Sequence, residues 1–204
     1  MNGKLLRIVI TGPESTGKST LSEQLAHAFK THWCPEFARN FLSRQPEKVL
    51  SSAEAPNGNY DYDDLLTIAR GQIALENEMA ENAIQQWSAQ TNPLTRQPVL
   101  FIDTDMYVMK VWSEFVFGKC HPYILQQIEQ RGYDLYLLCN TDLPWVKDEL
   151  REYPDPAVRN NLLQLYQNIL MNQSVPWSMV SGTASERVAS AENAIQRHFP
   201  YLFS

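Results

Sequence analysis

Short, uniformly apolar segments of the chain alternate with longer segments in which apolar residues recur every three or four positions. The former predict buried strands and the latter amphipathic helices. Strands are predicted at residues 5–11, 32–35, 99–102, 133–139 and 177–181, and helices at residues 17–29, 36–43, 62–87, 104–117, 157–171 and 184–199. This alternation is typical of an α/β fold, here a parallel five-stranded sheet with helices on both faces.

Two segments interrupt the alternation. Residues 46–60 carry two prolines, an Asn-Gly pair and serines, which predict a surface loop. Residues 144–156 mix prolines with charged residues and predict a loop or mobile lid, within a lid of approximately residues 143–160. The sequence shows no internal repeat, and 204 residues suit one domain, so we expect residues 1–204 to form a single domain.

Composition narrows the class of protein. Hydrophobic residues make up 44% of the chain and charged residues 20%, which excludes a disordered protein. A formal net charge of −6 argues against a general nucleic-acid binder or a protein that binds anionic membranes. No segment has the length of a membrane span, the apolar N-terminal stretch is too short for a signal peptide, and the three cysteines lack metal-ligand spacing. We therefore expect a soluble cytoplasmic protein without a membrane or nucleic-acid partner.

The segment Gly12-Pro-Glu-Ser-Thr-Gly-Lys-Ser19 matches GxxxxGK[ST], between a predicted strand and a predicted helix. Such a loop curls backbone N–H groups around phosphate oxygens at a helix N-terminus. Lys18 is expected to contact the β- and γ-phosphates, and the Ser19 hydroxyl to ligate Mg²⁺. An ordinary glycine-rich turn would lack this context. The residues expected to bind ATP here are Gly12, Pro13, Glu14, Ser15, Thr16, Gly17, Lys18, Ser19 and Thr20.

Acidic residues accompany this loop. Glu14 lies within a phosphate cradle, so either it points toward another partner, such as the second substrate or Arg39, or it is solvated. Asp103 ends the apolar segment 99–102 in the Walker B pattern and is expected to hold Mg²⁺, the alternative being a helix N-cap. Asp105 is expected in the acceptor site, with an N-cap or first-turn charge as the open alternative.

A small-molecule kinase fits the remaining pattern. The GTPase patterns DxxG and NKxD are missing after Asp103 and around Asn140. Glu36 and Arg39 are three residues apart and are expected either to bind the acceptor hydroxyl or to form a surface ion pair. Arg151 and Arg159 of the lid are expected either to stabilise the transferred phosphoryl group or to lie on a solvated helix face.

These motifs together resemble the ribosylnicotinamide kinase family, known as the C-terminal domain of bacterial NAD-salvage and regulator proteins. The matching segments are Gly12–Thr20, Glu36-Phe-Ala-Arg39, Phe101-Ile-Asp-Thr-Asp105, Gly118-Lys-Cys-His121-Pro122 and Trp145-Val-Lys-Asp-Glu-Leu-Arg151. The resemblance implies a P-loop NTPase fold and ATP-dependent phosphorylation of the ribose 5′-hydroxyl of nicotinamide riboside to the mononucleotide. It also implies that Lys119 and His121 lie near the active site.

The chain departs from the family in its lid, where Glu149 replaces a glycine. The adenylyltransferase domain of longer relatives and its HxGH motif are absent, so we expect the reaction to stop at the mononucleotide. Either Glu36 or Asp105 is expected to take the proton of the acceptor. Gly182, with its neighbours Ser181 and Thr183 and with Arg187, is expected either to contact adenine or to form a plain strand–turn–helix cap.

A pyridinium acceptor would favour aromatic faces. Tyr107, Trp112 and Phe115 are candidates, with helical core packing as the open alternative. Two other functions stay open: another small-molecule nucleoside or nucleotide kinase, and a non-catalytic ATP-binding regulatory module. The sequence leaves open the oligomeric state, the preference between nicotinamide and nicotinate riboside, and the use of ATP or GTP.

Overall fold

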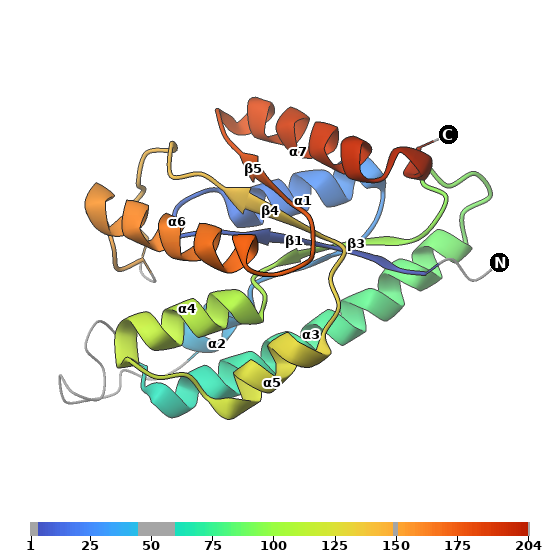
Figure 1. Ribbon diagram of the computed structural model, residues 1–204. Coiled ribbons are helices and arrows are strands. Elements are labelled where there is room, and N and C mark those ends of the chain that lie inside the picture. The colour runs from blue at the N-terminus through green and yellow to red at the C-terminus, as the bar shows by residue number, and fades with distance from the viewer. Residues whose placement is uncertain (1–3, 45–59, 149–150, 204) are drawn as a thin grey trace.

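Five parallel strands form one sheet in the order β2-β3-β1-β4-β5 (Figure 1). The computed structural model describes residues 4–44, 60–148 and 151–203. The strands are β1 (Leu6–Thr11), β2 (Trp33–Cys34), β3 (Val99–Asp103), β4 (Leu135–Cys139) and β5 (Trp177–Val180). The predicted fold class is confirmed, and each predicted strand is present within a few residues of its expected bounds.

Helices cover both faces of the sheet. They are α1 (Lys18–Phe29), α2 (Phe37–Leu42), α3 (Tyr62–Ser88), α4 (Met106–Phe117), α5 (Pro122–Gln130), α6 (Pro156–Met171), α7 (Ala184–His198) and the short 3₁₀ helix η1 (Pro200–Leu202). In Figure 1, α1 and α7 lie on one side of the sheet and α3 to α6 on the other. The sequence analysis missed α5, a helix of nine residues between the predicted helix 104–117 and the predicted strand 133–139.

Alternation along β1 divides the core between these two faces. Ile8 and Ile10 are fully buried toward α1 and α7, where they pack with Leu21 and Leu25. Val9 points to the opposite face and packs among residues of α3, α4 and α6. Because a parallel strand is covered on both faces, it is apolar throughout, which explains why the strands were easy to predict.

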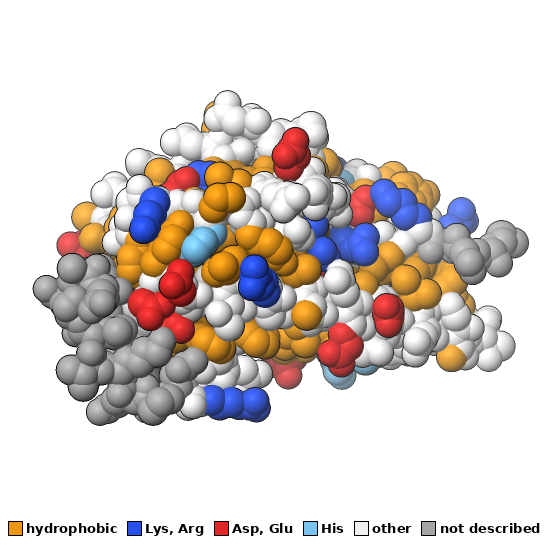
Figure 2. Space-filling model, turned by 90° about the horizontal axis from the view of Figure 1, so that it is seen from below, with side chains coloured by type: hydrophobic (Ala, Val, Ile, Leu, Met, Phe, Trp, Pro, Cys, Tyr) orange, Lys and Arg blue, Asp and Glu red, His pale blue; other side chains and the backbone are white. Residues whose placement is uncertain are grey.

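A third apolar cluster lies beside the sheet and joins α2, the first half of α3, α4 and α5. It includes Leu65, Ile68 and Met109. Figure 2 shows the underside of the molecule as drawn in Figure 1, where apolar side chains are interspersed with basic and acidic ones. The described part of this surface therefore presents a mixed chemistry rather than one sign of charge.

Parallel strands bring their carboxyl ends to one edge of the sheet, where ligands of such folds bind. The loops after β1, β3, β4 and β5 meet there, with β1 between β3 and β4. The expected loop at residues 46–60, apart from Tyr60, and Glu149 of the lid lie outside the described residues. Among the described helices, none is both long and apolar enough to cross a membrane.

Candidate active site

The loop after β1, Gly12–Thr20, has the geometry of a phosphate-binding loop. Gly12 has φ 133°, and a Cβ there would lie 2.8 Å from the carbonyl oxygen of Cys139, so only glycine fits. Gly17 has φ 78° directly before α1. The Thr16 hydroxyl and the Lys18 ammonium each donate a hydrogen bond to the Pro13 carbonyl, both at 2.8 Å. The loop is therefore closed on itself, at the N-terminus of a helix.

Asp103 lies at the end of β3, next to this loop, and is fully buried. Neither of its carboxylate oxygens makes a close hydrogen bond with the described residues. Burial raises the pKa of Asp103 to about 6, against the opposing positive charge of Lys18. A buried carboxylate beside the Ser19 hydroxyl fits a hard divalent cation such as Mg²⁺. The described residues hold no cluster of three His, Cys, Asp or Glu side chains that would bind a metal alone, so phosphate and water oxygens would complete the site.

A cavity of about 520 Å³ opens from the phosphate-binding loop and continues between α2, α4 and the lid. Of the residues expected from sequence to form the site, it brings together the whole of Gly12–Thr20 with Glu36, Arg39 and Arg151. Trp112 and Phe115, two of the three candidate aromatic residues, also line it. The residues expected to bind ATP and several of those expected to bind the acceptor thus line one cavity.

Part of the wall of this cavity is aromatic and acidic. Tyr60, Tyr153, Tyr166 and Glu152 line it, and the sequence analysis named none of them. Trp112 Nε1 donates to the Tyr60 hydroxyl at 2.9 Å, and that hydroxyl donates to Glu152 Oε2 at 3.0 Å. Burial raises the pKa of Glu152 to about 7, and the negative charge of Glu14 adds to this effect. The only available signal was the helical spacing of Tyr166 with Leu162 and Leu170 on α6.

Glu14 points to the lid rather than to Arg39. Its carboxylate accepts hydrogen bonds from Trp145 Nε1 at 3.3 Å and from the backbone N–H groups of Glu152 at 3.0 Å and Tyr153 at 2.5 Å. Arg39 instead donates to both carboxylate oxygens of Asp148, each at 3.0 Å. Of the alternatives left open for Glu14, the contact with Arg39 is therefore replaced by two separate contacts with the lid, one from each residue.

Arg159 also differs from its expected role. It is buried at the start of α6 and donates to the carbonyl oxygens of Ser15 and Leu143, at 3.2 and 3.3 Å. It does not line the cavity. Its side chain therefore joins the phosphate-binding loop to the start of the lid, rather than lying on a solvated face or reaching toward a phosphate.

The acceptor role expected for Asp105 and Tyr107 is not supported by their positions. Asp105 is the N-cap of α4: one carboxylate oxygen accepts from the Val108 backbone N–H at 3.2 Å, and the other from the Tyr136 hydroxyl at 3.2 Å. Both Asp105 and Tyr107 line a second cavity of about 270 Å³ instead of the first. The open alternative of an N-cap thus describes Asp105.

Lys119 and His121 lie at the connection between α4 and α5, outside the residues that line the main cavity. The Lys119 ammonium lies 4.1 Å from the centre of the Tyr62 ring, and the His121 ring stacks on the same ring at 3.8 Å. His121 Nε2 also lies 3.1 Å from the Tyr62 carbonyl oxygen. Their contacts support packing of this connection against α3 rather than the expected substrate binding.

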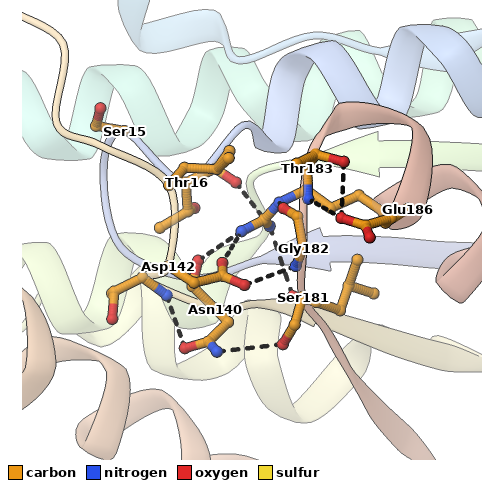
Figure 3. A network of polar contacts seen from close by, with 12 residues as sticks. Ser15, Thr16, Asn140, Asp142, Ser181, Gly182, Thr183 and Glu186 are labelled. Carbon is orange, nitrogen blue, oxygen red and sulfur yellow. Dashed lines mark hydrogen bonds and ion pairs between the residues drawn. The ribbon is translucent and has the colours of Figure 1, made fainter.

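Gly182 belongs to the polar network shown in Figure 3 rather than to the wall of the main cavity. The buried guanidinium of Arg187 donates to the carbonyl oxygens of Gly182, Thr16 and Asn140, each at 3.0 Å, and pairs with Asp142. Arg187 is therefore occupied in joining loops. Thr183 and Glu186 form the capping box of α7, the alternative that the sequence left open.

A family model described as an AAA domain matches residues 7–187 of the chain. Among curated proteins, the trifunctional NAD biosynthesis/regulator protein NadR of Escherichia coli (strain K12) is 27% identical over 173 residues, which make up 85% of this chain and 37% of that protein. The chain thus spans little more than a third of the length of this relative. The similarity to NadR confirms the resemblance expected from the motifs.

Solved structures are similar over nearly the whole chain. The crystal structure of NadR protein in complex with NR has a TM-score of 0.68 at 18% identity, and the match covers 95% of this chain and 50% of that one. Thymidylate kinase from Candida albicans has a TM-score of 0.64 at 14% identity, with 100% and 97% covered. These likenesses show the P-loop kinase fold.

Proposed function

The chain belongs to the AAA domain family and has a P-loop kinase fold, and from this premise we propose that it is an ATP-dependent kinase of nicotinamide riboside. In the proposed reaction the γ-phosphoryl group of ATP passes to the ribose 5′-hydroxyl, which gives nicotinamide mononucleotide. One observation carries the proposal: the phosphate-binding loop and an aromatic, acidic chamber are parts of one cavity of about 520 Å³. A regulatory module that only binds ATP needs no second chamber.

The chemistry of this chamber favours a cationic aromatic acceptor. Tyr60, Trp112, Phe115, Tyr153 and Tyr166 line it. Tyr60 and Trp112 meet edge to face with ring centres 5.0 Å apart, as do Phe115 and Tyr153 at 5.1 Å. Aromatic faces and carboxylates together attract a ring that carries positive charge. The pyridinium ring of nicotinamide riboside has this property, whereas uracil, cytosine and thymine are neutral.

Phosphoryl transfer depends mainly on positioning and on charge stabilisation. We assign Lys18 to the phosphates and Arg151, which lines the cavity, to the charge that develops on the transferred group. Glu36 lines the same cavity and is assigned to orient the acceptor hydroxyl and take its proton, since Asp105 lies elsewhere. Mg²⁺, held by Ser19, Asp103 and phosphate oxygens, would neutralise charge between the phosphates.

The proposal is tested by acceptor profiling. Purified protein is incubated with ATP and Mg²⁺ and separately with nicotinamide riboside, nicotinate riboside, uridine, cytidine, thymidine and thymidylate, and the products are identified by mass spectrometry. We expect nicotinamide mononucleotide and a matching amount of ADP. The proposal is overturned if nicotinamide riboside gives no turnover above background. Turnover of another acceptor would then assign a different nucleoside or nucleotide kinase. Tight ATP binding without any phosphorylated product would favour a regulatory module.

A further inference from the structure

Glu14 and Ser15 of the phosphate-binding loop hold the lid in place. The described part of the lid is residues 143–148 and 151–153. The Glu14 carboxylate accepts hydrogen bonds from the Trp145 indole and from the backbone N–H groups of Glu152 and Tyr153. The Ser15 hydroxyl oxygen accepts from the Val146 backbone N–H at 3.0 Å. Both sides of the lid are therefore attached to the loop that grips phosphate, through described residues alone.

The same lid residues form part of the cavity wall. Arg151, Glu152 and Tyr153 line the cavity, and Glu152 joins the hydrogen-bond chain of Tyr60 and Trp112. The position of the lid thus determines whether the acceptor chamber is complete. Because Glu14 accepts hydrogen bonds from the backbone of Glu152 and Tyr153 directly, it fixes this wall relative to the phosphate-binding loop.

The contacts of Glu14 also explain how a negatively charged carboxylate can be accommodated within a loop that binds phosphate. Three N–H donors from the lid offset its negative charge. With the lid displaced, the bare carboxylate would face the polyphosphate and repel it. A bound triphosphate and a closed lid are therefore mutually favourable, and a closed lid excludes water from the reacting groups.

We propose that Glu14 is a positioning residue that keeps the lid closed during the reaction, so that the phosphoryl group passes to the acceptor alcohol rather than to water. This inference rests on the proposed kinase function. In transfer, the γ-phosphorus bonds to the acceptor oxygen, its bond to the β–γ bridging oxygen breaks, ADP leaves, and the hydroxyl proton passes to Glu36. In hydrolysis, water replaces the alcohol and the products are ADP and inorganic phosphate.

The first test measures the partition between the two products. Glu14→Gln keeps the size of the side chain but removes the charge and places an NH₂ group among N–H donors; Glu23→Gln, an exposed carboxylate of α1, is the matched control. ADP, inorganic phosphate and the phosphorylated nucleoside are quantified with and without nicotinamide riboside. We expect Glu14→Gln to raise the ratio of hydrolysis to transfer about tenfold, and Glu23→Gln to leave it unchanged. An unchanged ratio in Glu14→Gln overturns the inference.

A second test needs no activity, so it separates this inference from the proposed function. Lys147 and Arg151 are trypsin sites within the lid. Limited trypsin digestion followed by mass spectrometry should show cleavage after these residues about tenfold faster in Glu14→Gln than in the wild type or in Glu23→Gln. Equal cleavage rates in Glu14→Gln and the wild type would count against the role proposed for Glu14, even if nicotinamide riboside is a substrate.

Stability could confuse both tests, so each variant is also melted. If Glu14→Gln does not fold, Trp145→Phe removes one donor to Glu14 while keeping an aromatic side chain, and Ser15→Ala removes the contact with Val146. Each should shift both readouts in the same direction by a smaller factor, at a melting temperature close to that of the wild type. Wild-type values in both of these variants overturn the inference.

Discussion

Lys18 supplies a positive charge within the phosphate-binding loop. Its ammonium is held by the Pro13 carbonyl at 2.8 Å, and its side chain lines the cavity. Because the loop is also closed by Thr16 and by its glycines, removal of the ammonium should leave the fold intact. We expect Lys18→Ala to lower kcat of the proposed kinase reaction on the order of 100- to 1,000-fold.

Steady-state kinetics and thermal melting check this prediction together. Lys4→Ala is the control, because Lys4 is an exposed lysine whose ion pair with Asp134 lies away from the cavity. It should keep wild-type activity. Wild-type turnover in Lys18→Ala would show that the phosphate-binding loop does not take part in the reaction.

Glu152 should make acceptor binding depend on pH. Burial raises its pKa to about 7, with added repulsion from Glu14, while the hydroxyl of Tyr60 and the contact with Tyr153 oppose the shift. The carboxylate is thus largely neutral below pH 7 and charged above it. KM for cationic nicotinamide riboside should therefore fall as pH rises through about 7, and Glu152→Gln should flatten this change. A pH profile of KM that is the same in both proteins would contradict the assignment.

Glu152 also affects stability with a defined sign. A carboxyl group whose pKa is raised on folding binds its proton more tightly in the folded state. Its contribution is complete below pH 4.5 and is lost as pH rises from about 4.5 to 7. Melting temperatures measured across this range should therefore fall less steeply with pH in Glu152→Gln than in the wild type. A steeper fall in the variant would mean that folding lowers the pKa of Glu152 instead of raising it, which would contradict its buried environment.

The positions of single residues could be inferred where they lie in one continuous motif. Gly12–Thr20 and Asp103 follow directly from strands, so their place at the sheet edge could be inferred. Asp105 shows the limit: two residues beyond Asp103, it points into α4 and caps that helix instead of facing the cavity. A sequence pattern gives spacing along the chain but not the direction of each side chain.

Among the helices, the contact between α2 and α3 depends on one glycine. A Cβ on Gly71 of α3 would lie 2.2 Å from the ring of Phe37, which begins α2. Gly71→Ala must therefore push this ring aside, at a cost of about 1–3 kcal/mol, partly offset by about 0.5–1 kcal/mol from the better helix propensity of alanine. We expect a net loss of stability in chemical denaturation.

The matched control for Gly71→Ala is Gly132→Ala, since a Cβ there meets nothing within 4 Å. It should leave the free energy of unfolding unchanged. Because α2 carries Ala38 and Arg39 into the cavity, Gly71→Ala should also raise KM for the acceptor. Equal stability of the two variants would show that Phe37 moves without cost.

Elements were predicted according to how long and regular their apolar pattern is. The strands and the 27-residue helix α3 carry long patterns, whereas α5 has only nine residues. The aromatic wall that we propose for the acceptor was the hardest part to predict. Tyr60 ends an expected loop, Tyr153 lies in the lid and Tyr166 on a helix, and only folding brings them together.

At the scale of the whole molecule, Arg187 shows how distant segments form the site. Its guanidinium joins the phosphate-binding loop at Thr16 to the loops after β4 and β5, at Asn140 and Gly182. Thr16 and Arg187 are 171 positions apart in the chain. No local pattern predicts such a contact. The phosphate-binding loop therefore contacts both the loops at the end of the sheet, through Arg187, and the lid, through Glu14. It is a junction between these distant segments.

A ligand that fills this junction should stabilise the molecule as a whole. A ligand that binds only the folded state at 100 times its dissociation constant adds about 2.7 kcal/mol, which corresponds to roughly 5–10 °C in Tm for a protein of this size. We expect a non-hydrolysable ATP analogue with Mg²⁺ to produce such a shift. In Lys18→Ala, at the same analogue concentration, the shift in Tm should be much smaller. Weaker binding lowers the ratio of analogue concentration to dissociation constant, and this ratio determines the shift.

Hydrogen exchange locates the source of this stabilisation. Protection should rise in the phosphate-binding loop and, through Glu14 and Ser15, in the described lid residues 143–148 and 151–153. Nicotinamide riboside added to the analogue complex should extend protection to α2 and α4, which line the acceptor chamber. Protection confined to the phosphate-binding loop, with the lid exchanging as before, would mean that the loop and the lid move independently despite the hydrogen bonds between them.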